Sequence, residues 1–129
     1  KIEVVEDHEW LGFHHIHLRS PDPAVTLSWY ADIFGGTRDS LKGRVSGLRY
    51  GTVWLLVTPH EGELAPTEGR AFDHLGWQFP DLRAEAENIK RKGVEFDIEV
   101  RPFTNPLGEE MLISFVTGPD GVRIEIVQP

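Results

Sequence analysis

Two histidines, His15 and His74, open the same short phrase of sequence: a histidine, five further residues and then Pro-Asp. Near the end of the chain, Glu125 stands among apolar residues in a strand-like run that follows a Gly-Pro-Asp-Gly turn. Neutral imidazole and carboxylate suit a divalent Fe, Mn, Ni, Co or Zn ion, and three protein ligands leave coordination positions open. Alone, each histidine would be read as a hydrogen-bonded strand residue. The repeated spacing instead predicts one divalent metal ion held by His15, His74 and Glu125.

The direction of the strand side chains supports this metal site. Successive residues of a strand face opposite sides of a sheet, so three predicted strands each have an apolar face and a polar face. A solvated face would carry Lys, Glu, Ser and Thr. The polar faces carry other groups: His15, His17 and Arg19; His74, Gly76 and Gln78; Arg123, Glu125 and Val127. We therefore interpret these faces as the walls of a site.

Further residues on these runs are candidates for catalysis or substrate binding. The candidate catalytic residues are His17 and Glu125. The pKa of a histidine suits proton transfer near neutral pH, although His17 could instead orient a ligand, ligate the metal or only line the wall. The candidate substrate-binding residues are Arg19, Gln78, Arg123 and Trp54. A guanidinium matches a carboxylate or phosphate with two hydrogen bonds, but the two arginines could equally pair with acids of the protein.

The elements that must carry these residues form one series. Alternation over 13–20 predicts a strand, and Asp22 followed by proline is typical of a helix start. Val25, Trp29 and Ile33 recur every four residues, with Tyr30 and Phe34 alongside, and predict an amphipathic helix whose apolar side is buried. Strands are then predicted at 37–42, 45–50 and 52–58.

The same series starts again after a stretch rich in Pro, Gly and Glu. Residues 72–79 predict a strand, Asp81 caps a second helix, and further strands are predicted at 94–100, 110–117 and 122–127. The sequence therefore predicts a single domain over 13–128 made of two β-α-β-β-β modules. The modules are 13–58 and 72–128, with a linker at 59–71 and an N-terminal arm at 1–12.

Composition excludes several classes of function. The chain of 129 residues has no cysteine, which rules out disulfides, thiolate catalysis and Cys-based zinc sites. Its net charge of −8 argues against nucleic acid or an anionic membrane as a partner. No apolar run approaches the roughly 20 residues that span a bilayer. We expect a soluble protein, cytoplasmic, or periplasmic or secreted if a signal peptide once preceded Lys1.

Three phrases of the sequence resemble one known family. They are His15-Ile-His-Leu-x3-Asp22-x6-Trp29-Tyr30-x3-Phe34-Gly35, His74-x6-Asp81 and Pro119-Asp120-Gly121-x3-Glu125. Over 13–128 the chain resembles the vicinal oxygen chelate superfamily, which includes glyoxalase I, bleomycin-resistance proteins, fosfomycin-resistance enzymes, methylmalonyl-CoA epimerase and extradiol dioxygenases. The resemblance implies a glyoxalase-like α+β fold of two βαβββ modules, with a cupped mixed sheet and helices on the outside. It also implies a homodimer and metal ligands at His15, His74 and Glu125.

The sequence departs from glyoxalase I at one position. That enzyme has a fourth ligand, an acid on the last strand of the first module, where this chain has Leu55 or Leu56 depending on register. We therefore expect a metal-dependent enzyme other than glyoxalase I, an isomerase, lyase or dioxygenase whose small oxygen-rich substrate chelates the ion. The alternative is a non-catalytic, drug-sequestering protein like the bleomycin-resistance proteins. A metal-stabilised structural or sensory domain is a third possibility.

Overall fold

The computed structural model describes residues 3–4, 6, 8 and 11–129. The chain forms two compact units, Lys1–Gly62 and Glu63–Pro129, which are described separately. The boundary between them lies within the predicted linker 59–71. Each unit has the element order β-α-β-β-β and a four-stranded mixed sheet, which confirms the predicted α+β fold class with two such modules.

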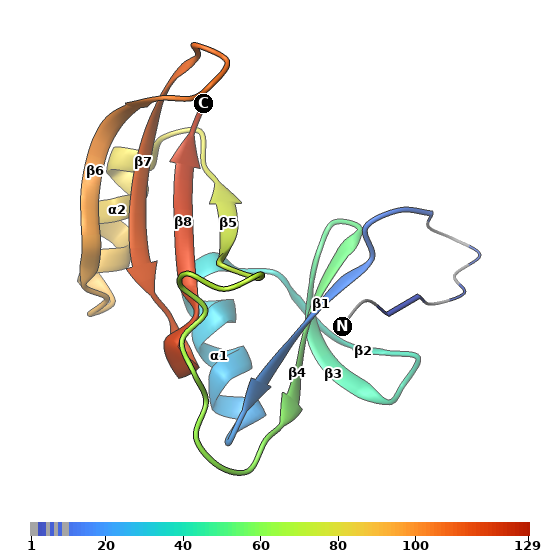
Figure 1. Ribbon diagram of the computed structural model, residues 1–129. Helices are drawn as coiled ribbons and strands as arrows, with labels where there is room; N and C mark the ends of the chain where they lie inside the picture. The colour runs from blue at the N-terminus through green and yellow to red at the C-terminus, as the bar shows by residue number, and fades with distance from the viewer. Residues whose placement is uncertain (1–2, 5, 7, 9–10) are drawn as a thin grey trace. The chain divides into compact units, whose positions relative to one another are not determined.

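The first unit carries one helix and four strands (Figure 1). Its elements are β1 (His15–Ser20), α1 (Pro23–Phe34), β2 (Thr37–Leu41), β3 (Val45–Tyr50) and β4 (Val53–Pro59). The strand order in the sheet is β1-β4-β3-β2. β1 and β4 run parallel, whereas the other neighbours are antiparallel. The first and last strands of this module, β1 and β4, therefore lie side by side.

The second unit repeats this topology (Figure 1). Its elements are β5 (His74–Gln78), α2 (Leu82–Arg91), β6 (Phe96–Thr104), β7 (Glu110–Thr117), the 3-10 turn η1 (Pro119–Gly121) and β8 (Arg123–Gln128). The strand order is β5-β8-β7-β6, with β5 parallel to β8. The predicted strand 94–100 in fact continues to Thr104, because β6 stays paired with β7 up to a tight turn. In that turn the side-chain oxygen of Asn105 accepts hydrogen bonds from the backbone N–H groups of Leu107 and Glu109.

Both helices begin at an aspartate, as predicted. The carboxylate of Asp22 accepts the N–H of Val25 at 3.1 Å, and that of Asp81 accepts the N–H of Ala84 at 3.0 Å. These bonds satisfy backbone donors that the first turn of a helix leaves without a partner. The predicted buried side of the first helix was wrong at Val25, which is exposed. The buried side is formed by Thr26, Leu27, Tyr30, Ile33 and Phe34.

Each helix covers the apolar face of the sheet in its own unit. In the first unit the buried strand residues on that face include Leu18, Leu48, Leu55 and Val57. In the second unit they include Leu75, Val116, Ile124 and Ile126. Burial of such a side chain is worth about 1.5–3 kcal/mol, so these faces fix which side of each strand is left for the polar residues. Among the described residues, no helix is both long and apolar enough to cross a membrane.

Candidate metal centre

The first unit presents His15 and His17 on the face of its sheet that is opposite to the helix. In the parallel pairing of β1 with β4, His15 lies beside Trp54 and His17 lies beside Leu56. Residues paired in this way point to the same side of a sheet. The side chain of His15 is only 5% exposed, whereas that of His17 is 33% exposed. One imidazole is therefore sheltered and the next can meet solvent.

The ring of His15 is held by the residue that precedes it. The Nδ1 atoms of His14 and His15 lie 2.9 Å apart, and the two rings pack edge to face. When His15 donates through Nδ1, its Nε2 keeps the lone pair that a metal requires. Burial lowers the pKa of His15, and the nearby His17 lowers it further while Glu3 opposes the shift, so the neutral form is favoured.

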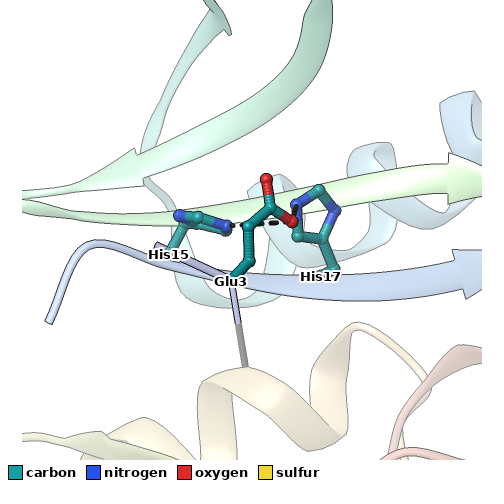
Figure 2. A group of neighbouring side chains, drawn as sticks. All are labelled: Glu3, His15 and His17. Carbon is teal, nitrogen blue, oxygen red and sulfur yellow. Dashed lines mark ion pairs between the residues drawn. The ribbon is translucent and has the colours of Figure 1, made fainter. Parts of the chain in front are cut away.

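Glu3, from the N-terminal arm, lies against both of these histidines. Its Oε2 is 3.8 Å from Nε2 of His15 and 3.4 Å from Nε2 of His17. Figure 2 shows the carboxylate reaching between the two imidazoles. In the described part of the chain these three side chains form a group whose ligand atoms lie within 4.8 Å of one another. Glu3 could not be identified from the sequence, because the arm has no clear hydrophobic period.

The second unit brings His74 and Glu125 together. β5 and β8 run parallel with Gly76 beside Glu125, so the carboxylate is on the same face as His74. Nε2 of His74 and Oε2 of Glu125 are 3.7 Å apart. Both side chains are partly accessible, at 39% and 28%. Two of the three predicted metal ligands therefore face each other within one unit.

Asp73 fixes the ring of His74 from the other side. Its Oδ1 lies 2.7 Å from Nδ1 of His74, and the N–H of Gly69 donates to its Oδ2 at 2.5 Å. The hydrogen bond with His74 lowers the pKa of Asp73, with the Gly69 N–H as the next contribution, so Asp73 is an anion at neutral pH. A carboxylate on one ring nitrogen turns the other nitrogen toward a metal. The sequence analysis missed this role, although an acid directly before the histidine was a usable signal.

Arg123 is engaged by acids of its own unit. Its Nη1 lies 2.9 Å from Oε1 of Glu68 and 3.6 Å from Oδ1 of Asp73. The guanidinium also stacks over the ring of Phe115 at 4.3 Å, and the rings of Phe115 and His74 pack in a T-shaped arrangement with their centres 5.9 Å apart. Pairing with a protein acid was one of the two alternatives for this residue. A role for Arg123 in substrate binding stays a prediction.

The other predicted substrate-binding residues are Arg19, Gln78 and Trp54. Arg19 is exposed and donates from Nη1 to the carbonyl of Pro59 at 3.3 Å. Gln78 is exposed at the end of β5. Trp54 is half-buried on the face of His15, with the guanidinium of Arg49 at 6.0 Å from its ring centre. These positions leave all three side chains near a polar face of their own sheet.

Comparison of the two sheets resolves the register that the sequence left open. His15 and His74 begin equivalent strands, so His17 is equivalent to Gly76. Leu56 pairs with His17 as Glu125 pairs with Gly76. Leu56 therefore occupies in the first unit the place of Glu125 in the second, and Leu55 faces the helix. The carboxylate near His15 comes from Glu3 instead of from β4.

Known proteins share this sequence pattern and fold. Residues 12–126 match the Glyoxalase/Bleomycin resistance protein/Dioxygenase superfamily. The uncharacterized protein YaeR of Escherichia coli (strain K12) is 28% identical, over 89% of this chain and 94% of its own length. The fosfomycin resistance protein FosX from Listeria monocytogenes superimposes with a TM-score of 0.71 at 19% identity, covering 93% of this chain and 94% of that chain. A glyoxalase I mutant from Zea mays gives a TM-score of 0.71 at 25% identity, covering 91% of this chain and 44% of that chain. The chain described here belongs to the Glyoxalase/Bleomycin resistance protein/Dioxygenase superfamily.

Proposed function

We propose that the protein is a metal-dependent enzyme that acts on a small oxygen-rich molecule. His15, His74 and Glu125 hold one divalent ion, which is Fe, Mn, Ni, Co or Zn. The observation that carries this proposal is the pair of His74 and Glu125, whose ligand atoms lie 3.7 Å apart. Two ligand atoms that each bind one tetrahedral ion at about 2.1 Å are about 3.4 Å apart, so this pair needs only a small adjustment.

The donor set also fits a metal. Both histidines have Nδ1 in contact with the preceding residue, at 2.9 Å for His15 and 2.7 Å for His74. Metal-ligating histidines nearly always have such a partner on the second ring nitrogen. A bound divalent metal supplies Lewis-acid polarisation of two adjacent substrate oxygens. Three protein ligands leave positions for those oxygens.

The remaining residues of the site bind and orient the substrate and move a proton. His17 is on the same face as His15 and is one-third exposed, so it can exchange a proton with a bound molecule. Glu125, as a ligand, holds its negative charge at the reacting group. Substrate contacts are proposed for Arg19, Gln78, Arg123 and Trp54. Isomerase, lyase and dioxygenase reactions all fit these roles, and a reaction with dioxygen requires Fe or Mn.

We also propose that the protein is a homodimer. β2 and β6 each stand at the edge of a sheet. An edge strand presents unpaired backbone groups, which a second copy of the chain would cover. Sedimentation of the purified protein over a range of concentrations tests this: a dimer mass supports it, and a monomer mass at all concentrations contradicts it.

The alternative function is non-catalytic binding of a drug-like molecule. The half-buried ring of Trp54, on the face that carries His15, is the observation in its favour. This alternative does not require an ion, whereas the enzyme does. The two functions therefore differ in a quantity that can be measured without knowledge of the substrate.

Elemental analysis of protein purified without chelators separates them. The enzyme is expected to retain, or to take up on dialysis, one divalent ion per chain. Protein that takes up no divalent ion contradicts the proposed function and favours the binding protein. Once the metal is known, thermal-shift screening with diols, dicarbonyls and hydroxy acids in the presence of that metal identifies the substrate class.

A further inference from the structure

We propose that Glu3 is an additional ligand of the metal, supplying on the side of His15 the carboxylate that β4 does not provide. The inference rests on the proposed function, because it concerns the same ion. The N-terminal arm would then supply a ligand that the two repeated modules do not provide. The ligand set then becomes two histidines and two glutamates.

Each unit places a glutamate oxygen near the Nε2 atom of a histidine. Nε2 of His15 lies 3.8 Å from Oε2 of Glu3, and Nε2 of His74 lies 3.7 Å from Oε2 of Glu125. In both cases the Nδ1 atom of the histidine contacts the preceding residue, His14 or Asp73. Each Nε2 therefore has a glutamate oxygen at a similar distance. The difference is that one carboxylate comes from β8 and the other from the arm.

β4 provides no carboxylate on the face of His15. Leu56 holds the place that Glu125 holds in the second unit, and the sequence of β4, Val-Trp-Leu-Leu-Val-Thr-Pro, has no acid. A leucine cannot bind a cation. The side chain of Leu56 instead lies over Gly47, where an added Cβ would be 2.7 Å from Cδ2 of Leu56. The carboxylate that lies near His15 comes from another segment, at Glu3.

Two described residues of the arm, Glu3 and Glu6, contact other residues of the first unit. The carboxylate oxygen of Glu3 that faces His15 is also 3.4 Å from Nε2 of His17. Further along the arm, Nζ of Lys42 donates to the backbone carbonyl of Glu6 at 3.0 Å. Lys42 is in the turn between β2 and β3, so this bond attaches the arm to the same unit. The position of Glu3 is thus supported by its own contacts with the histidines and by the bond that holds Glu6, three residues further along the chain.

A competing interpretation makes the opposite prediction for metal affinity. If Glu3 only paired with the two histidines, it would occupy the lone-pair side of His15 and compete with the ion. Removal of its charge would then leave metal affinity unchanged or increase it. If Glu3 is a ligand, removal of its charge decreases metal affinity. The sign of the change therefore decides between them.

The test is the affinity of the full-length chain for Zn²⁺ and Co²⁺, measured by competition with a chromophoric chelator. Glu3→Gln is compared with Glu6→Gln, which removes the same charge from the same arm. The carboxylate of Glu6 is exposed and pairs with the exposed His8 at 3.6 Å. We expect Glu3→Gln to weaken binding about 100-fold or more, since loss of an outer partner already costs about 10–100-fold. Glu6→Gln should weaken it less than about fivefold. The visible spectrum of bound Co²⁺ should change only for Glu3→Gln.

Circular dichroism and the melting temperature of the metal-free variants control for folding. Binding by Glu3→Gln that is as tight as that of Glu6→Gln, or tighter than wild type, overturns the proposal. Glu125→Gln in the same assay separates this proposal from the proposed function. If Glu125→Gln loses the metal and Glu3→Gln does not, the inference about Glu3 fails and the function stands. If Glu3→Gln loses the metal and Glu125→Gln does not, Glu3 is a ligand and the ligand set of the proposed function is wrong.

Discussion

Oδ1 of Asp73 lies 2.7 Å from Nδ1 of His74, so the ring of a candidate metal ligand is oriented by the residue directly before it. Asp73 is itself held by the N–H of Gly69 and by the guanidinium of Arg123. The first unit has a similar contact between His14 and His15. These contacts turn Nε2 of each histidine toward a glutamate and away from its own backbone. The orientation of these two candidate ligands is therefore built into short local segments at the start of β1 and β5.

Substitution of Asp73 should weaken metal binding without removing a ligand. Asp73→Asn abolishes the charge-assisted hydrogen bond to His74, and loss of such a partner typically costs about 10–100-fold in affinity. Glu68→Gln is the matched control, because Glu68 pairs with Arg123 as Asp73 does. Its affinity should stay near that of wild type. Equal affinities of the two variants, measured by chelator competition, would show that Asp73 does not position His74.

The equivalence of Leu56 with Glu125 predicts where a carboxylate can be added. Leu56→Glu and Leu55→Glu both place an acid at a buried position, so both should lower the melting temperature of the metal-free protein. Leu56 is on the face of His17, whereas Leu55 is on the helix side. A divalent ion that binds the folded state stabilises it in proportion to its affinity. Added Zn²⁺ should therefore restore the melting temperature of Leu56→Glu but not that of Leu55→Glu.

The outcome that contradicts this register is equally simple to observe. If Zn²⁺ stabilises Leu55→Glu and not Leu56→Glu, the face assignment is wrong. If Zn²⁺ stabilises neither variant beyond wild type, Leu56 is not near the ion. Differential scanning fluorimetry with and without Zn²⁺ distinguishes these two outcomes from the expected one.

Much of the fold could be predicted from the sequence because its signals are local. A cap at Asp22 or Asp81 acts within one turn of helix, and strand alternation repeats every two residues. Both signals appear twice in the same order, which made the two modules recognisable. The family followed from the same phrases and is confirmed by the match over 12–126.

The rest of the site depends on contacts between distant segments. The choice between Leu55 and Leu56 requires the partner strand β1, which the sequence of β4 does not contain. The place of Glu3 depends on an arm folding back onto β1, and no spacing rule predicts that. The apolar side of α1 was predicted correctly at Tyr30, Ile33 and Phe34 but not at Val25, because the period of a helix does not say how far its first turn extends over the sheet.

The alkaline stability of the protein should depend on Tyr50. Burial raises the pKa of this phenol, and its hydroxyl faces the carbonyl of Tyr30 at 3.5 Å. In the unfolded chain Tyr50 ionises near pH ~10, whereas in the folded protein it stays protonated. Its contribution to stability is therefore fully present below that pH and is lost as the pH rises toward the folded pKa.

Tyr50→Phe removes this pH dependence. Melting temperatures measured across the alkaline range should fall less steeply with pH for Tyr50→Phe than for wild type. At neutral pH the two proteins should differ only by the loss of one weak hydrogen bond. Parallel curves for the two proteins would show that Tyr50 ionises equally in the folded and unfolded states.

The central claim is that Glu125, with His15 and His74, holds a divalent metal ion, and one titration tests it most directly. Glu125→Gln keeps the size of the side chain and its place on β8 but removes the negative ligand beside His74. Metal content and affinity are measured by elemental analysis and chelator competition, with circular dichroism to show that the variant is folded. The account predicts one tightly bound ion per wild-type chain and no tight binding by folded Glu125→Gln. Unchanged metal content in that variant would contradict it.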